Sequence, residues 1–219
     1  MALSARLQAK NQLVLSYPAL SLVFSGFSTN NIDMSKFPSL KNHLLIAMPS
    51  LKDAHFSRSV TLLCEHNKDG AMGIVINHPL DFSTGELLEH MEIPCNENHN
   101  INPVFAGGPV QVDRGFVVHR AEKLWKSSIQ LDKHISITTS SDILHAIGRH
   151  EIDDEAFVAL GYAGWESGQL EQEIMENSWL TVPVDPEILF NTDVDKRWEQ
   201  AAALLGVDIN NLSDFAGHA

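Results

Sequence analysis

Short apolar runs separated by turn residues recur along most of the chain, and this pattern predicts β-strands. The runs on either side of the Asn67–Gly70 turn are expected to pair antiparallel, because its final Asp-Gly supplies the positive φ that a tight hairpin needs. The run Ala156–Tyr162 is strongly apolar, and we expect it to lie near the centre of a sheet. The predicted strands are 43–48, 59–65, 71–77, 103–106, 115–119, a short one around 129, 135–138, 156–162 and 180–182.

Other segments carry the signals of helices. Ser83 is followed by Glu86 at the spacing of a capping box, which predicts a helix that runs to about Met91. The remaining predicted helices are 141–147, 168–177 and a last one near 194–205, closed by Gly206. Because strands and helices interleave and at least one hairpin is present, the sequence predicts an α+β fold with a mixed sheet.

The length of 219 residues is that of one compact domain. The first 33 residues differ from the rest, because a serine-dotted apolar stretch follows two basic residues. A signal peptide has these features, but Met34 offers an alternative start directly before the regular pattern, and we favour a misplaced gene start. The stretch is too short, and too interrupted by Tyr17 and Pro18, for a transmembrane helix. We therefore place residues 1–33 outside the fold, as a misplaced start or a disordered extension, and expect one domain over 34–219.

Net charge and cysteine content indicate which partners and which cellular compartment to expect. The formal net charge of −13 disfavours nucleic acid, because phosphate binding needs clustered Lys and Arg. Cys64 in an apolar strand and Cys95 in a polar turn make no disulfide framework, so we expect a reducing, cytoplasmic compartment and a buried, inert thiol at Cys64. One basic segment is either a solvated face or a patch for an anionic partner, and it comprises Arg114, Arg120, Lys123, Lys126 and Lys133.

The chain contains no motif of a common catalytic or cofactor-binding site. It lacks a P-loop, a Gly-x-Gly-x-x-Gly after a strand and a Gly-x-Ser-x-Gly elbow. Its 11 histidines do not occur at the spacing of metal ligands. Cys64 and His66 are expected to share one face of a strand, but two ligands are too few for a metal site. We therefore predict no metal and no cofactor.

Two glycine-rich segments remain as candidates for a site. Phe105–Val110 contains Gly107 and Gly108, whose main-chain amides can approach an anion closely, although a Gly-Gly turn between strands is also common architecture. Gly161–Glu173 runs from the central strand through a loop into a helix, which is where open α/β sheets bind ligands. Its aromatic and acidic side chains serve either a site or the packing of the core.

Four motifs, in order, resemble the AlgH/YqgE family of small bacterial proteins. They are Phe56–Val60, Gly73–Pro79, Gly107–Val110 and Gly161–Glu173, the last followed by Asn177 and Trp179. The resemblance implies a cytoplasmic protein with a compact α+β fold, whose largely antiparallel sheet curls toward a pseudo-barrel and packs with several helices. It assigns no reaction. Some members carry the label of transcriptional regulator, but this chain has no helix-turn-helix pattern, so we expect any regulation to be indirect.

The sequence favours a binding or regulatory module with a protein or small-molecule partner and no membrane partner. Its candidate binding residues are Arg58, Asn77, Gly107, Gly108, Tyr162, Trp165, Gln169, Glu171 and Glu173. On this hypothesis, alanine at Gln169 and Glu173 should impair function and leave the melting temperature nearly unchanged. The alternative is an enzyme in which Glu171 or Glu173 is the general base and Arg58 binds an anionic substrate. Direct DNA binding by the basic segment is the least favoured hypothesis.

Overall fold

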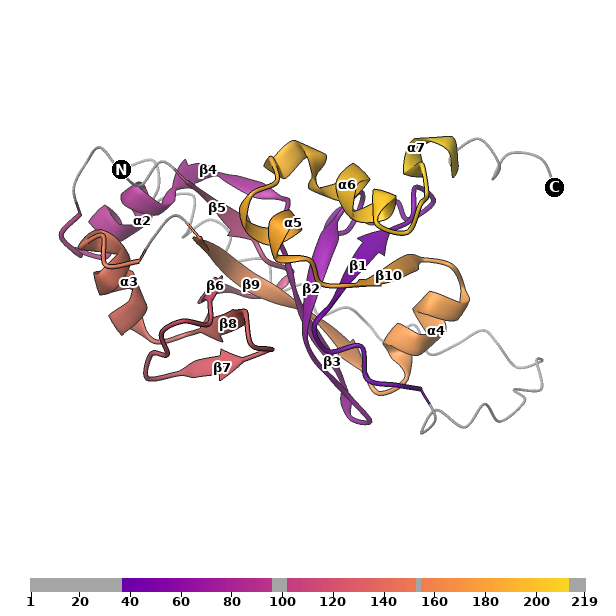
Figure 1. Ribbon diagram of the computed structural model, residues 1–219, viewed down its shortest axis with the longest axis horizontal. Helices are drawn as coiled ribbons and strands as arrows, with labels where there is room; N and C mark the ends of the chain where they lie inside the picture. Colours follow the sequence, from indigo (N-terminus) through magenta and orange to yellow (C-terminus); the bar gives the residue numbers. More distant parts are fainter. Residues whose placement is uncertain (1–36, 96–101, 153–154, 213–219) are drawn as a thin grey trace. The chain divides into compact units, whose positions relative to one another are not determined.

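The computed structural model describes residues 37–95, 102–152 and 155–212 (Figure 1). The strands are β1 (His43–Ala47), β2 (Val60–Asn67), β3 (Gly70–Val75), β4 (Pro79–Ser83), β5 (Pro103–Ala106), β6 (Val110–Arg120), β7 (Ser128–Gln130), β8 (Ile135–Thr138), β9 (Ala156–Glu166) and β10 (Trp179–Pro183). The helices are α2 (Thr84–His90), α3 (Ser141–Gly148), α4 (Gln169–Met175), α5 (Pro186–Phe190), the 3-10 helix η2 (Val194–Lys196), α6 (Arg197–Ala203) and α7 (Ile209–Leu212). The strands predicted from the apolar runs are all present, whereas β4 and α7 were not predicted.

The strands form one strongly curled, largely antiparallel sheet, which confirms the predicted α+β class. Along its main path the strand order is β10-β1-β2-β3-β9-β6-β8-β7, and every neighbouring pair on that path is antiparallel. Strand β5 pairs antiparallel with β4 and parallel with β9, so the sheet is mixed. Strand β9 is central, as predicted: β6 lies along one edge, and β5 and then β3 lie along the other.

Apolar side chains alternate between the two faces of the sheet and build a core on each. Leu44, Ile46, Val60 and Leu62 face the cluster that α5, α6 and α7 cover. The opposite face carries two clusters, one beneath α4 and one beneath α2 and α3. Figure 1 shows these helices in three groups, with α4 well apart from α2 and α3. Since both faces are covered, even an 11-residue strand such as β9 is buried over most of its length.

Arg197 ties helix α6 to the sheet from within the core. Its side chain is 5% exposed, its Nε donates to the main-chain oxygen of Thr192, and its Nη1 donates to that of Ile76 at the end of β3. The guanidinium lies over the rings of Phe105 and Phe157, at 5.3 and 5.6 Å from their centroids. Burial lowers the pKa of Arg197 to about 10, so the charge is kept at neutral pH and is stabilised by carbonyl dipoles and aromatic faces.

Local signals in the sequence predicted the helix ends well. Ser83 Oγ accepts from Glu86 N–H and the Glu86 carboxylate accepts from Ser83 N–H, which is the expected capping box of α2. The last predicted helix is divided into η2 and α6, and Gly206 has the left-handed φ of 70° expected of a helix end. Cys64 is 8% exposed, as expected, and burial raises the pKa of its thiol above the ordinary value.

The prediction that Cys64 and His66 share a strand face is wrong. A β-bulge between Leu63 and Glu65 shifts the register of β2 against β3 and breaks the alternation. Cys64 therefore packs beneath the C-terminal helices, whereas His66 bonds to helix α4 on the opposite face. The two side chains cannot bind one metal ion.

Candidate functional site

The two glycine motifs meet in space, at a point where the chain crosses strand β9 between β5 and β6. Gly107 N–H donates to Leu160 O at 2.8 Å, so this amide is already used within the sheet. A Cβ atom on Gly107 would lie 2.4 Å from the oxygen of Gly161, and one on Gly108 would lie 2.1 Å from the main-chain carbon of Tyr162. The turn is not a hairpin, because β5 and β6 lie on opposite edges of β9. Glycine is required here for close main-chain packing, and the amide of Gly107 is not available to an anion.

Trp165, Gln169 and Glu173 form one connected cluster, together with Trp179. Glu173 Oε2 accepts from the indole N–H groups of Trp165 and Trp179 at 2.9 and 2.8 Å, and Glu173 Oε1 accepts from Gln169 Nε2 at 2.9 Å. Gln169 Oε1 in turn accepts from the N–H of Glu166. Both indoles are nearly buried, with 7% and 3% of their surface exposed. Helix α4, which carries Glu173, therefore docks on the sheet through the Glu173 carboxylate, and this carboxylate satisfies the indole N–H groups of Trp165 and Trp179.

Glu171 is the second acidic residue of the predicted set, and it is separate from this cluster. Its side chain is 9% exposed, and its Oε1 lies 3.0 Å from Nε2 of His66 on β2. The pair is formed across 105 residues of sequence. His66 was considered at the sequence level only as a metal ligand, and no local pattern links it to a helix so far along the chain.

Arg58 and Asn77 lie together at the turn that precedes β2. Asn77 Oδ1 accepts from Val60 N–H at 2.7 Å, and Asn77 Nδ2 donates to Arg58 O at 2.9 Å, so this amide clamps the turn. Arg58 has a left-handed φ of 56°, which is strained for an L-residue with a side chain. Its guanidinium lies 4.5 Å from the ring centroid of Trp198 on α6 and 3.7 Å from Glu199 Oε1.

The turn 53–58 is held from three sides. Its own hydrogen bonds run from the N–H groups of residues 55, 56 and 57 to Asp53. Phe56 packs against the rings of Trp165 and Trp179 at 6.2 and 5.7 Å. His78 lies beneath the turn, where burial lowers its pKa, and hydrogen bonds to the main chain at 55 and 57 oppose that shift. Phe56 and His78 belong to the motifs of the family resemblance, but neither was among the predicted binding residues.

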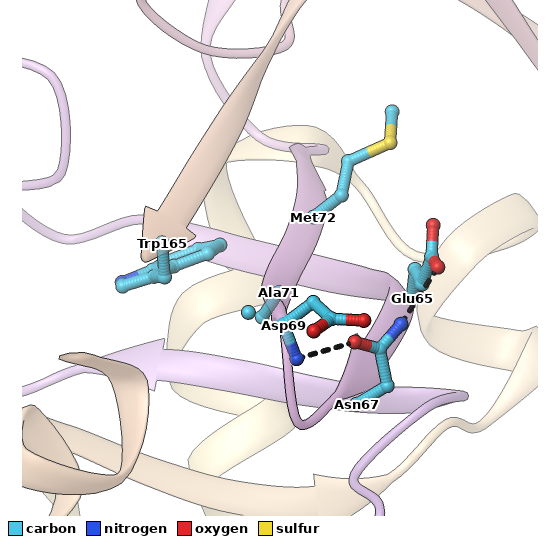
Figure 2. A pocket seen from close by; sticks show the side chains of 7 residues that line it. Glu65, Asn67, Asp69, Ala71, Met72 and Trp165 are labelled. Carbon is cyan, nitrogen blue, oxygen red and sulfur yellow. Dashed lines mark hydrogen bonds between the residues drawn. The ribbon is translucent and has the colours of Figure 1, made fainter. Parts of the chain in front are cut away.

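A hollow of about 210 Å³ opens at the tip of the β2–β3 hairpin. Its walls are formed by Glu65, Asn67, Asp69, Gly70, Ala71, Met72 and Trp165. Figure 2 shows Trp165 and Glu65 on opposite sides of β3, so the indole and that carboxylate do not converge on one ligand. Asn67 is used internally, because its Nδ2 donates to Glu65 and its Oδ1 accepts from the N–H of Asp69, both at 2.8 Å.

The basic segment 114–133 is partly neutralised by acidic residues. Arg120 makes two hydrogen bonds to the carboxylate of Glu155. Lys123 lies 3.9 Å from Glu151, and the exposed Arg114 lies over the ring of Phe116. The segment is therefore not a continuous cationic stripe of the kind that follows a phosphate backbone.

Within the described parts of the chain, no group of three or more His, Cys, Asp or Glu side chains is arranged to hold a metal ion. In those same ranges, no helix has the length and apolar character needed to cross a membrane.

The fold and this site define an α+β protein in which a curled sheet is covered by helices on both faces and the predicted polar residues divide into three groups. Comparison with known proteins gives the family. The family model described as DUF179, AlgH-like, matches residues 44–210, and the chain belongs to this AlgH-like family.

Relatives and solved structures agree with this family. A UPF0301 protein of Thioalkalivibrio sulfidiphilus is 53% identical over 186 residues, which are 85% of this chain and 100% of the relative. The solution structure of the AlgH protein from Pseudomonas aeruginosa is 41% identical with a TM-score of 0.67, and the match covers 90% of this chain and 100% of that one. A Corynebacterium diphtheriae protein shares the fold at 21% identity, with a TM-score of 0.62 over 81% of this chain and 92% of its own.

Proposed function

We propose that this protein is a binding or regulatory module that recognises an acidic group of a protein or small-molecule partner at the turn 53–58. The observation that carries the proposal is the state of Arg58. Its side chain is 64% exposed, and its Cζ lies 4.5 Å from the ring centroid of Trp198. This cation–π contact restrains the guanidinium while its exposure leaves N–H groups in solvent, and exposed guanidinium N–H groups bind carboxylates and phosphates.

The donors of Arg58 are little used by the described part of the chain. Among the described residues, the one ion-pair contact of the guanidinium is to Glu199 at 3.7 Å, beyond hydrogen-bond distance. Glu199 is itself half exposed, with 48% of its side chain in solvent, so water screens the pair. An incoming acidic group can therefore form short hydrogen bonds that Glu199 does not.

The remaining predicted residues support this surface from behind. Asn77 holds the main chain of Arg58, and the crossing at Gly107 and Gly108 packs closely on β9. The cluster around Glu173 anchors Phe56 of the same turn through the two indoles. On this proposal these residues are support, and Arg58 is the one that touches the partner.

The alternative of an enzyme with Glu171 or Glu173 as general base has less support. Three donors already bond to the carboxylate of Glu173, and Glu171 is nearly buried against His66. A general base needs an oxygen within reach of a substrate proton. Neither carboxylate has that freedom while α4 is docked on the sheet.

We further propose that the protein acts in the cytoplasm and that any influence on transcription is indirect. The net charge of −13 and the pairing of Arg120 and Lys123 with acidic residues disfavour direct contact with DNA.

The test is a thermal-shift screen of the full chain against carboxylate- and phosphate-bearing metabolites, run beside Arg58→Gln and Arg114→Gln. Arg114 is the matched control, since it is also an exposed arginine over an aromatic ring. A ligand at 100 times its Kd adds about 2.7 kcal/mol, which for a domain of this size raises the melting temperature by roughly 5–11 °C. We expect the shift to persist in Arg114→Gln and to vanish in Arg58→Gln.

If no metabolite raises the melting temperature, immobilised wild type and Arg58→Gln are compared for capture of proteins from a cell extract. The expected result is a protein that only the wild type retains. Ligands or proteins that bind both forms equally would remove Arg58 from the binding surface and reject the proposal.

A further inference from the structure

His66 joins three segments of the chain that are distant in sequence. Its Nδ1 lies 2.8 Å from the N–H nitrogen of Leu40, just before β1, and its Nε2 lies 3.0 Å from Glu171 Oε1 on α4. Its main-chain oxygen accepts from Ser39 Oγ at 2.8 Å. The imidazole is 3% exposed. Leu40 is thus attached to the sheet through the buried ring, and Ser39 through the main-chain oxygen of the same residue.

The geometry fixes where the proton of this ring lies. A main-chain N–H can only donate, so Nδ1 must accept from Leu40 and must carry a lone pair. The single proton of the neutral ring is then on Nε2, from which it is donated to Glu171. An imidazolium at this place would point an N–H at the N–H of Leu40, and with the ring 3% exposed water has little access to Nδ1 to accept that proton.

The groups around the ring determine what a second proton would do. From α4, Glu171 faces Nε2 and would attract an imidazolium more strongly than a neutral ring. From the described residues before β1, the amide of Leu40 faces Nδ1 and the hydroxyl of Ser39 bonds to the main-chain oxygen of His66, and from β3 the paired residue is Ala71. Lys41 and Glu65 are exposed neighbours in sequence. Protonation therefore strengthens the contact with α4 and breaks the contact with Leu40.

We propose that His66 is a pH-sensitive latch, in which uptake of one proton keeps the ring on Glu171 and releases Leu40 from the sheet. The turn in which His43 N–H donates to Leu40 O at 3.1 Å is lost with it, while β1 stays paired on both sides. Leu40 packs against the apolar cluster beneath α4. Its departure uncovers that cluster, so the latch controls access to apolar surface beside the Trp165–Glu173 cluster.

The experiment follows the full chain by NMR between about pH 8 and about pH 5, the range in which histidine side chains titrate. At the upper end, the ring nitrogen shifts of His66 should show the proton on Nε2. As the ring titrates, amide-exchange protection of Leu40 should fall by about tenfold per pH unit, as expected when one proton is linked to opening. The amide of Ala47, bonded to Ser59 O within the sheet, is the internal reference and should keep its protection.

Two variants distinguish the latch from general acid loosening. His66→Asn keeps an oxygen near the position of Nδ1 and cannot be protonated, so Leu40 should stay protected down to the lowest pH. Glu171→Gln keeps an acceptor for Nε2 but removes the charge that favours the imidazolium, so release should move to lower pH even if His66→Asn fails to fold. His145→Asn, at an exposed histidine of α3, is the matched control and should behave as the wild type.

Three outcomes would overturn the latch. They are a ring that carries its proton on Nδ1 at neutral pH, a ring that stays neutral until the whole protein unfolds, and a ring that titrates while Leu40 keeps its protection. None of them depends on a ligand at Arg58, so the failure of this inference and the failure of the proposed function are separate results.

Discussion

Replacing Glu173 by alanine removes the acceptor of two buried indole N–H groups, and we expect it to destabilise the fold substantially. Trp165 and Trp179 donate to the same oxygen of Glu173 and are 7% and 3% exposed. A buried donor that loses its partner costs about 1–3 kcal/mol, so two of them predict a loss of roughly 2–6 kcal/mol. We expect about 3 kcal/mol, in the lower half of this range, because Glu173 is only half-buried and water can compensate in part.

The measurement is urea unfolding and thermal unfolding of wild type and variant, followed by far-UV circular dichroism. For a domain of this size, a loss of about 3 kcal/mol lowers the melting temperature by roughly 6–12 °C. Glu173→Gln should lose less, about 1 kcal/mol, because its amide oxygen can still accept from the indoles although it carries no charge. Near-UV circular dichroism should weaken in Glu173→Ala, since the rings of Trp165 and Trp179 lie 6.1 Å apart and are held together by this carboxylate.

The matched control is Glu176→Ala on the same helix. Glu176 is exposed, and its side chain accepts from Gln172 Nε2 at 2.9 Å, so its loss should change stability by no more than about 0.5 kcal/mol. If Glu173→Ala is as stable as Glu176→Ala, the indole hydrogen bonds do not stabilise the fold and the reasoning fails. A double-mutant cycle that combines Glu173→Ala with Trp165→Phe measures the coupling free energy between the two side chains. If the indole hydrogen bond stabilises the fold, that coupling should exceed about 1 kcal/mol.

Three further predictions rest on other buried groups. Burial lowers the pKa of His119 in the fold, so below about pH 6.5 the unfolded chain binds a proton that the folded protein excludes, and stability should fall as the pH drops through that range. Urea unfolding of His119→Gln should show a shallower pH dependence than that of the wild type. Gly108→Ala places a Cβ 2.1 Å from main-chain atoms at a φ of 152° and should lower the melting temperature sharply, whereas Gly115→Ala has open space around its Cβ and should be neutral in the same measurement. In the native state a thiol reagent should modify Cys95 before Cys64, because Cys64 is buried and its pKa is raised, and equal rates would contradict that burial.

Local patterns allowed the elements of the fold to be predicted, because each pattern reports hydrogen bonds within a few residues. The capping box of Ser83 and Glu86 is complete within one helical turn, and the Asp-Gly turn before β3 sets its own hairpin. Strand β9 was recognisable as central because a strand covered on both faces has no polar side to alternate with. The bulge after Leu63 has no such signal, and its effect is to reverse the faces of the residues that follow it.

The candidate site was predicted in its members but not in their roles. Glycine at 107 and 108 indicates that another group packs closely against the main chain there. It does not indicate whether that group is the main chain of β9, as the structure shows, or an anion. Gln169 and Glu173 were expected to leave the melting temperature unchanged when replaced, whereas their bonds to each other and to two indoles now predict the opposite for Glu173. The roles of these residues depend on contacts with side chains and main-chain atoms of other helices and strands. A single sequence does not show which of these groups are in contact.

The turn 53–58 connects the two layers that cover opposite faces of the sheet. Phe56 contacts the aromatic cluster beneath α4, and two residues later Arg58 contacts Trp198 in the layer of α6. A turn restrained from both faces can hold Arg58 at its strained φ of 56°, because release of that strain would require one of the two layers to give up its contact. On the proposed function, a partner at Arg58 would meet a turn whose main chain is already held from both faces, so binding would not have to order that turn first.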